Sequence, residues 1–254
     1  MITRRQFAAG SLVGLAALRG GYGALAQEAT PSGNESVATF TTPVVLEDGI
    51  IVDHYRVANS AIEGNSVVLG SVTNARNETV AIPAFGFRVT VLDKDRVILG
   101  SATPGPVYPV IPPGRSIGFI ATFSEIVAAD IDTEAVRFEA DGFLSDAPVI
   151  EQLAEATVEI ESEEEISRDG DNLAIEYVVR NTSDLEYSGL VLESAIWDAD
   201  WYFCGKTTAY VHNTLLPGDA IRFTTQTTGY AFNPLTVAGD DFTVEPWVVP
   251  TVST

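Results

Sequence analysis

A turn-and-strand signature occurs twice in this chain. Pro113–Phe119 has the sequence P-G-R-S-I-G-F and Pro217–Phe223 has the sequence P-G-D-A-I-R-F, so both follow P-G-x-x-I-x-F. A Pro-Gly turn followed by apolar residues two positions apart predicts a turn leading into a β-strand with one buried face. A chain that repeats this signature 104 residues later is constrained to a repeated β-architecture.

Other landmarks repeat at nearly the same spacing. The pairs are Asn74 and Asn181 at 107 residues, and Asp93 with Asp198 and Gly100 with Gly205 at 105. A spacing that drifts so little predicts a duplicated domain. We expect a first repeat over residues 43–147 and a second over 148–254, with the boundary near 142–148.

The patterns inside each repeat are those of short strands. Phe87–Leu92 and Val97–Leu99 flank a D-K-D-R turn and predict a hairpin, and Val67–Asn74 is an apolar, β-rich run. In Leu173–Asn181, alternate residues are apolar, so Leu173, Ile175, Tyr177 and Val179 are expected to face inward. About seven strands per repeat, with turns between them, predict an all-β chain of two tandem immunoglobulin-like β-sandwich domains.

The N-terminus carries an export signal. Arg4 and Arg5 precede an apolar run over residues 8–18 and an A-x-A site at residues 24–26, which predicts a signal peptide over residues 1–26. The paired arginines resemble a twin-arginine signal. The apolar run is too short to span about 30 Å of hydrocarbon, so the mature chain is expected to carry no transmembrane segment. Residues 27–42, rich in Thr, Ser, Pro and Gly, are expected to form a flexible leader.

The strand ends and turns of both repeats resemble the FxLYD family of extracellular Ig-like domains. The matching segments are Val72–Asn74, Val89–Asp93 and Gly114 with Phe119, and then Val179–Asn181, Ser194–Asp198 and Gly218 with Phe223. Arg96 and Trp201 stand where that family usually has a glycine after the Asp hairpin. The resemblance implies an extracellular or envelope module without an established chemistry, and it carries over no catalytic residue.

Composition excludes several classes of partner. The formal net charge is −21, from 35 acidic and 14 basic residues, which disfavours nucleic acid and anionic membrane surfaces. This acidic, lysine-poor composition fits either an adaptation to high salt or a genome that prefers arginine codons. Cys204 is the only cysteine; it excludes an intrachain disulfide and is expected to be a buried small hydrophobe.

Metal binding has candidates in the turns. Asp93 with Asp95 and Asp198 with Asp200 offer oxygen ligands of the kind that Ca²⁺ takes. Asp is also an ordinary hairpin residue whose side chain bonds its own backbone. Neither pair makes a complete calcium loop, so plain turns are the preferred interpretation.

The chain offers no recognised catalytic motif and no cofactor motif. His54 and His212 are its only histidines, at non-equivalent positions and outside any zinc-binding spacing. We therefore expect a non-enzyme without a cofactor. The alternatives are a secreted hydrolase with unrecognised carboxylates and a Ca²⁺-stabilised surface module.

Aromatic residues suggest a binding role. Trp201 and Tyr202 are adjacent on a strand near the Asp198 turn, so one of them must point away from the core. An outward ring can stack on a sugar or anchor a partner protein, or it can cover the junction with the first repeat. The sequence thus predicts an exported binding or spacer module at the cell envelope, whose partner is another envelope protein or a carbohydrate.

Overall fold

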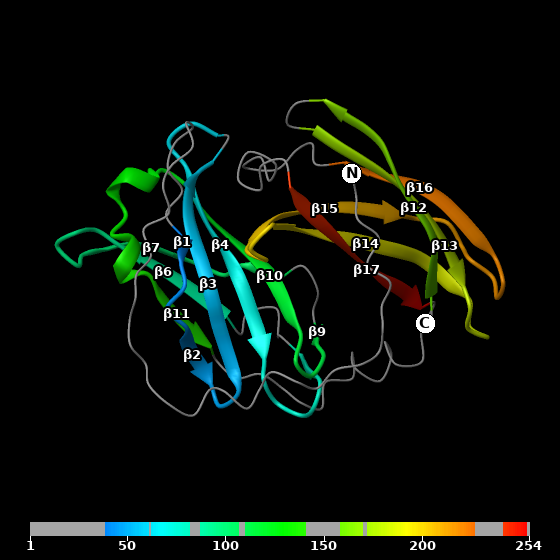
Figure 1. Ribbon diagram of the computed structural model, residues 1–254, viewed down its shortest axis with the longest axis horizontal. Coiled ribbons are helices and arrows are strands. Elements are labelled where there is room, and N and C mark those ends of the chain that lie inside the picture. The colour runs from blue at the N-terminus through cyan, green and yellow to red at the C-terminus, as the bar shows by residue number, and fades with distance from the viewer. Residues whose placement is uncertain are drawn as a thin grey trace. The chain divides into compact units, whose positions relative to one another are not determined.

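The computed structural model describes residues 39–60, 62–81, 87–106, 110–140, 158–169, 172–226 and 241–252. These residues form β-strands and two 3₁₀ turns, Ala128–Asp130 and Thr133–Ala135, with no α-helix among them. The all-β prediction is confirmed. Figure 1 shows the strands of the first repeat in blue to green and those of the second in yellow-green to red.

Four sheets contain most of the strands. Sheet A has the order β1-β3-β4-β10-β8, and β2 also pairs with β3. Its strands are β1 (Thr39–Phe40), β2 (Val44–Glu47), β3 (Ile50–Asn59), β4 (Ser66–Asn74), β8 (Gly105–Pro106) and β10 (Ser116–Phe123). Sheet B has the order β11-β6-β7; its strands are β6 (Phe87–Leu92), β7 (Ile98–Ala102) and β11 (Arg137–Ala140). The short strands β5 (Val80–Ala81) and β9 (Val110–Ile111) pair with each other.

The second repeat supplies the other two sheets. Sheet C has the order β12-β13-β16; its strands are β12 (Val158–Asp169), β13 (Asn172–Asn181) and β16 (Ala220–Gln226). Sheet D has the order β15-β14-β17; its strands are β14 (Tyr187–Asp198), β15 (Phe203–Val211) and β17 (Phe242–Val252). All pairings in the four sheets are antiparallel.

Sheets A and B pack face to face around an aromatic core. Phe87 of β6 meets Phe119 of β10 edge-on with ring centroids 5.0 Å apart, and Phe138 of β11 meets Tyr55 of β3 at the same distance. Edge-to-face rings of this kind are a favoured arrangement of aromatic quadrupoles. The predicted hairpin over residues 87–99 is confirmed, because β6 and β7 pair.

Sheets C and D enclose a second core. Leu173, Ile175, Tyr177 and Val179 of β13 are all 0 % exposed, so the predicted inward face is confirmed. The Tyr177 hydroxyl lies 3.0 Å from Ser194 Oγ of β14, across the two sheets. A buried phenol usually needs such a partner.

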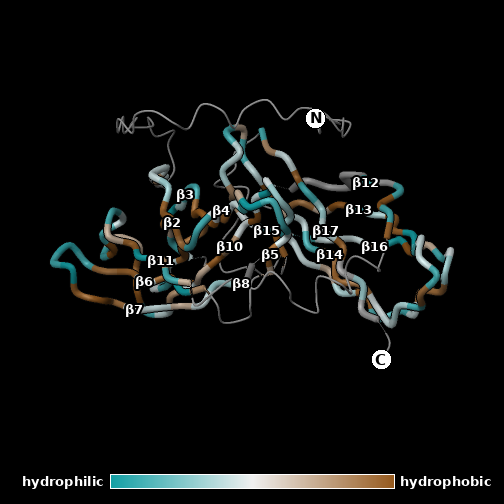
Figure 2. The backbone as a smooth tube through the Cα atoms, turned by 90° about the horizontal axis from the view of Figure 1, so that it is seen from below, coloured by the Kyte–Doolittle hydropathy of each residue, from teal (hydrophilic) through white to brown (hydrophobic). Residues whose placement is uncertain are grey.

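A third apolar cluster joins the two repeats. Ala58, Val67 and Leu69 of sheet A lie with Ala195, Trp197 and Phe203 of sheet D, and all six are nearly fully buried. Strand β4 is therefore covered on both faces, since Val68 and Val72 belong to the first core. An uninterrupted apolar run such as Val67–Leu69 is typical of a strand with no solvent face. Figure 2 shows hydrophobic residues along the strands and hydrophilic residues at many of the turns.

Corresponding turns of the two repeats have corresponding hydrogen bonds. Asn74 Nδ2 donates to the carbonyls of Glu78 and Ile111, and Asn181 Nδ2 donates to those of Leu185 and Leu215. The Pro-Gly turns close onto the same asparagines, with Gly114 N donating to Asn74 O at 2.7 Å and Gly218 N to Asn181 O at 2.9 Å. The asparagine of the V-x-N strand end thus braces the turn before the P-G strand in each repeat.

Two predicted boundaries need comment. Thr39–Phe40 pairs with β3, and Phe40 stacks on Tyr55 at 5.1 Å, so the end of the predicted leader over residues 27–42 belongs to sheet A. The physical reason is that Phe40 buries its ring there. The predicted signal peptide and the boundary at 142–148 lie outside the described residues. Residues 37–254 form one compact unit, and no described helix is long and apolar enough to cross a membrane.

Candidate functional site

The Asp198 turn of the second repeat and the Asp93 turn of the first have the same geometry. Asp93 Oδ1 accepts from the amides of Asp95 and Val97, at 2.9 and 2.8 Å. Asp198 Oδ1 accepts from the amides of Asp200 and Tyr202, at 3.0 and 2.9 Å. Each aspartate therefore holds its own turn with one carboxylate oxygen.

A residue in the left-handed backbone region follows in each turn. Arg96 has φ 64° and Trp201 has φ 63°. This region is unfavourable for a bulky L-residue. The Asp side chain and the hairpin hydrogen bonds hold the backbone there, so both turns adopt the left-handed conformation with a residue other than glycine.

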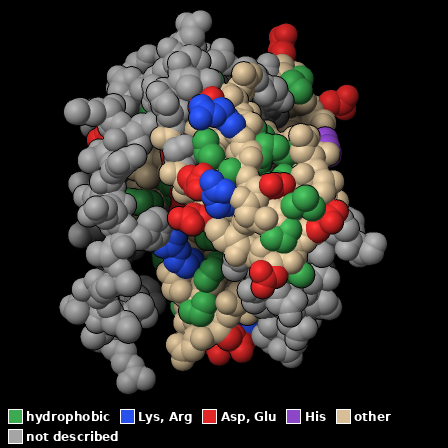
Figure 3. Space-filling view, turned by 90° about the vertical axis from the view of Figure 1, so that its right-hand side faces the viewer, with side chains coloured by type: hydrophobic (Ala, Val, Ile, Leu, Met, Phe, Trp, Pro, Cys, Tyr) green, Lys and Arg blue, Asp and Glu red, His purple; other side chains and the backbone are tan. Residues whose placement is uncertain are grey.

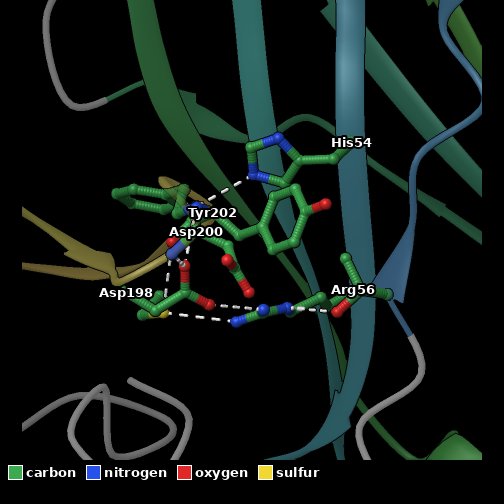
Figure 4. A network of polar contacts seen from close by, with 8 residues as sticks. His54, Arg56, Asp198, Asp200 and Tyr202 are labelled. Atoms are coloured by element: carbon green, nitrogen blue, oxygen red, sulfur yellow. Dashed lines mark hydrogen bonds and ion pairs between the residues drawn. The ribbon is translucent and has the colours of Figure 1, made fainter. Parts of the chain in front are cut away.

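The second oxygen of Asp198 makes an ion pair that crosses between the repeats. Arg56 Nη2 on β3 donates to Asp198 Oδ2 at 2.6 Å, and the two side chains are only 9 % and 12 % exposed. Figure 4 shows the guanidinium and the carboxylate pointing toward each other. If either partner of such a buried pair is removed, the other is left as an unpaired buried charge, which strongly destabilises the fold.

The other two nitrogens of the Arg56 guanidinium also have partners. Arg56 Nε donates to Thr39 Oγ1 at 2.6 Å, and Nη1 lies 3.3 Å from Cys204 Sγ. The guanidinium carbon lies 5.2 Å from the centroid of the Tyr202 ring, within the range of a cation–π contact. Arg56 thus ties β1 of the first repeat to the start of β15 in the second.

His54 makes a second polar link across the junction. The amide of Phe203 donates to His54 Nε2 at 2.9 Å, which fixes Nε2 as the acceptor and Nδ1 as the protonated nitrogen. Nδ1 lies 3.2 Å from Ser71 Oγ. Burial first, and then the Arg56 charge, lower the pKa of His54 to about 4. With both nitrogens engaged and the ring neutral, His54 is placed to hold the junction and has no free nitrogen for general base catalysis.

Asp53, which is partly buried, ends this polar chain. Its Oδ2 accepts from Ser71 Oγ at 3.2 Å and also from Thr73 Oγ1. Burial raises the pKa of Asp53 against the lowering effect of these hydroxyl donors. In this order serine lies between the acid and the histidine and donates to the acid, so the group differs from a Ser-His-Asp triad, in which histidine takes the proton of serine.

Cys204 is buried and free, as predicted. Burial raises its pKa to about 12, although the nearby Arg56 charge acts in the opposite direction. A thiol with so high a pKa stays protonated near neutrality and is a poor nucleophile. Cys204 therefore serves as a packed residue beside the Arg56 side chain.

The predicted metal candidates remain in separate turns. Asp93 and Asp95 lie in the first repeat, Asp198 and Asp200 in the second, and in each turn one Asp accepts from the amide of the other. Asp198 is further committed to Arg56. Within the described residues, no group of three or more His, Cys, Asp or Glu side chains is placed to hold a metal ion.

The two aromatic candidates have different positions. Trp201 is 55 % exposed at the tip of the turn, with its ring centroid 6.3 Å from that of Trp197. Tyr202 lies at the junction, with its ring centroid 4.8 Å from that of His54. Tyr202 thus covers the junction with the first repeat, and Trp201 is the ring that points outward.

Sequence reasoning missed Arg56 as a site residue and gave His54 no role. Nothing in their local pattern marks them, because their partners lie more than 140 residues away in the chain. The one available signal was the continuous apolar run Val67–Leu69, which indicates a second covered face of sheet A.

Sheet C has a different outer surface. Arg180 of β13 pairs with Glu161 of β12 at 2.5 Å, and Arg222 of β16 pairs with Glu176 of β13 at 2.6 Å. Figure 3, seen from the side on which sheet C lies in Figure 1, shows basic and acidic side chains close together with hydrophobic ones scattered among them. This surface is solvated and charged, unlike the outer face of sheet A.

Comparisons with known proteins name no family. No protein-family model matches the chain, and no curated protein matches it either. Among solved structures, a Bacteroides uniformis β-glucuronidase 2 aligns with 75 % of this chain and 25 % of its own, at 12 % identity and a TM-score of 0.27.

Other structural matches are equally distant. A red sea bream transglutaminase aligns at 10 % identity over 78 % of this chain and 30 % of its own, with a TM-score of 0.20. The Momordica charantia 7S globulin aligns at 8 % identity over 85 % and 84 %, also with a TM-score of 0.20. The chain thus spans about a quarter of the length of the β-glucuronidase. Scores this low carry no argument about fold or function.

Proposed function

We propose that this chain is an exported, non-catalytic pair of tandem Ig-like β-sandwiches that acts as a rigid binding or spacer module at the cell envelope. The observation that carries the proposal is the buried junction between the repeats. It combines the apolar cluster around Phe203 with the Arg56–Asp198 ion pair. Such a junction holds two domains in a fixed relation, whereas a domain pair with a small polar interface moves freely.

The matched turns support the tandem Ig-like part of the proposal. Asn74 and Asn181 make corresponding bonds, and so do Asp93 and Asp198. Two sheets around one core in each repeat is the arrangement of a sandwich.

The engagement of the reactive side chains supports a non-catalytic role. His54 has a partner on each ring nitrogen, and Cys204 is buried with a raised pKa. A catalytic base needs an acceptor nitrogen within reach of a substrate proton, and the acceptor Nε2 of His54 already takes the amide hydrogen of Phe203. The polar atoms of these two side chains contact other residues of the junction.

Rigidity can be measured directly. Spin labels attached at Ile62→Cys and Tyr210→Cys, which replace side chains that are 58 % and 66 % exposed, report the distance between the repeats by pulsed electron resonance. We expect one narrow distance distribution. The same labels in a Phe203→Ala background serve as the control and should give a broad distribution. A broad distribution in the parent chain would argue against a rigid module.

Export and envelope location need a second experiment. We expect the full chain to be recovered with the exported, envelope-associated fraction of the producing cells. Changing Arg4 and Arg5 to lysine should retain it in the cytoplasm. Recovery of the parent chain inside the cell would overturn the proposed location. Turnover of a panel of glycosides by the purified chain, abolished by changing a single acid, would favour the alternative of a secreted hydrolase.

A further inference from the structure

The β6–β7 hairpin of the first repeat is the structural counterpart of the hairpin that docks in the second. Each has its Asp turn, its left-handed residue and a register shift at the same point, between Val91 and Leu92 and between Ile196 and Trp197. Leu92 pairs with Ile98 as Trp197 pairs with Phe203. Val97 and Ile98 thus occupy the positions of Tyr202 and Phe203.

The burial of these counterparts differs sharply. Phe203 is 0 % exposed because sheet A covers it, whereas Val97 and Ile98 are 58 % and 59 % exposed. In Figure 1 the β6–β7 hairpin projects at the left, away from the strands of the second repeat. Two adjacent aliphatic side chains are left in water at a position whose counterpart is a buried anchor.

The face that receives Phe203 has a defined chemistry. Val67 and Leu69 supply aliphatic surface, and Gly118 supplies a gap, because a Cβ at Gly118 would lie only 2.1 Å from the nearest carbon of the Phe203 ring. Arg56 reaches from the same sheet to Asp198 at the base of the docked hairpin. A receptor for such a hairpin is thus an aliphatic sheet face with a glycine and a neighbouring arginine.

Neither the outer face of sheet A nor the outer face of sheet C offers that chemistry to the β6–β7 hairpin. The outer face of sheet A is already occupied by the second repeat. The outer face of sheet C carries Arg222 at the position equivalent to Gly118, and Arg222 is paired with Glu176. A charged side chain in place of a glycine both fills the gap and would lose its solvation on docking.

We infer that the β6–β7 hairpin, with Val97 and Ile98 as its apolar contact, docks on the outer sheet face of a β-sandwich domain in a partner protein. That face is aliphatic, contains a glycine opposite Ile98, and carries an arginine that pairs with Asp93. Asp93 keeps one oxygen for its own turn, as Asp198 does, and offers the other. This inference rests on the proposed binding role and names the class of partner.

A photocrosslinking amino acid at Val97 in the full exported chain tests the inference in the producing cells. We expect one heterologous adduct whose crosslinked peptide maps to a sheet face rich in Val, Leu and Gly. The matched control places the same crosslinker at Ile62, which is equally exposed and should give no such adduct. Ile98→Asp should reduce the Val97 adduct at least tenfold, while Ile62→Asp leaves it unchanged.

Four results would overturn the inference. They are the absence of a specific adduct at Val97, an adduct between two copies of this chain, an adduct to a partner that is not a β-sandwich, and an adduct insensitive to Ile98→Asp. Melting temperatures of both Asp variants, expected within a few degrees of the parent because the sites are exposed, verify folding. If the inference fails while the chain still fractionates with the envelope as one rigid unit, the proposed function stands.

Discussion

At the residue scale, Gly118 leaves the space on sheet A into which the ring of Phe203 packs. Its counterpart in the second repeat is Arg222, and only the glycine leaves room for the ring of Phe203. Gly118→Val should therefore destabilise the chain by about 1–3 kcal/mol through overpacking. Urea denaturation measures the cost.

A double-mutant cycle with Phe203→Ala identifies the cause of that cost. Removing the ring removes the obstacle, so Gly118→Val should cost less in the Phe203→Ala background than in the parent chain. Equal costs in both backgrounds would show that the clash with Phe203 is not responsible.

His54 provides a pH dependence at the residue scale. Its pKa in the folded chain is lowered to about 4 from the ordinary 6.5, so the unfolded state binds the proton more readily. The stabilisation is complete above pH 6.5 and is lost as pH falls toward 4, by about 3 kcal/mol in all. The groups facing His54 are Arg56, Asp198, Tyr202 and Ser71.

Comparison with His54→Gln isolates this contribution from that of the carboxylates. The variant should lose less stability than the parent between pH 6.5 and pH 4, as measured by urea denaturation at each pH. His212→Gln, at an exposed site, is the matched control and should follow the parent. Parallel curves for the parent and His54→Gln would contradict the assignment.

At the scale of secondary-structure elements, two ion pairs of similar length are expected to contribute differently to the stability of the fold. Arg56–Asp198 lies between β3 and the start of the 198–203 turn and is nearly buried, whereas Arg222 in the pair on sheet C is 68 % exposed. Arg56→Met leaves Asp198 unpaired and should cost about 3–5 kcal/mol. Arg222→Met should cost less than about 1 kcal/mol.

A second substitution separates charge burial from general damage to the strand. Asp198→Asn in the Arg56→Met background removes the unpaired charge but keeps the turn acceptor Oδ1. It should recover part of the lost stability in chemical denaturation. If the double variant is less stable than Arg56→Met alone, the loss does not come from the orphaned carboxylate.

The Asp hairpins also bear on calcium. In each turn, Oδ1 of the first Asp accepts from two backbone amides, and Oδ2 of Asp198 pairs with Arg56. A calcium ion needs about six oxygen ligands, so we expect millimolar Ca²⁺ to leave the melting temperature unchanged, with Mg²⁺ as the control. A rise specific to Ca²⁺ would revive the cation-stabilised alternative.

For the whole molecule, the junction couples two cores that would otherwise unfold separately. The cluster around Phe203 contacts residues on both sides and joins sheet A to sheet D. Calorimetry of the parent chain should therefore give one cooperative transition. Phe203→Ala opens a cavity in the cluster and should separate the trace into two transitions. Two transitions in the parent would mean that the repeats are energetically independent.

Local pattern was enough to predict the β-class, the β6–β7 hairpin and the inward face of β13. Alternation through Leu173, Ile175, Tyr177 and Val179 has the two-residue period of a strand with one buried face, and that period is a property of neighbouring residues. The same holds for the Asp turns, because each aspartate bonds amides within four residues of itself. Because the residues in such interactions are close together in the sequence, a local pattern is enough to predict them.

Only the tertiary structure decided what the polar residues do. Arg56 and Asp198 are 142 positions apart, and His54 and Phe203 are 149 apart, so no local window contains both partners. Whether a charge lies in water or in a junction depends on which faces meet, and here the faces of sheets A and D meet with the ring of Phe203 packed against Gly118. The repeats share one turn chemistry in sequence, but packing made one hairpin an anchor and left the other exposed.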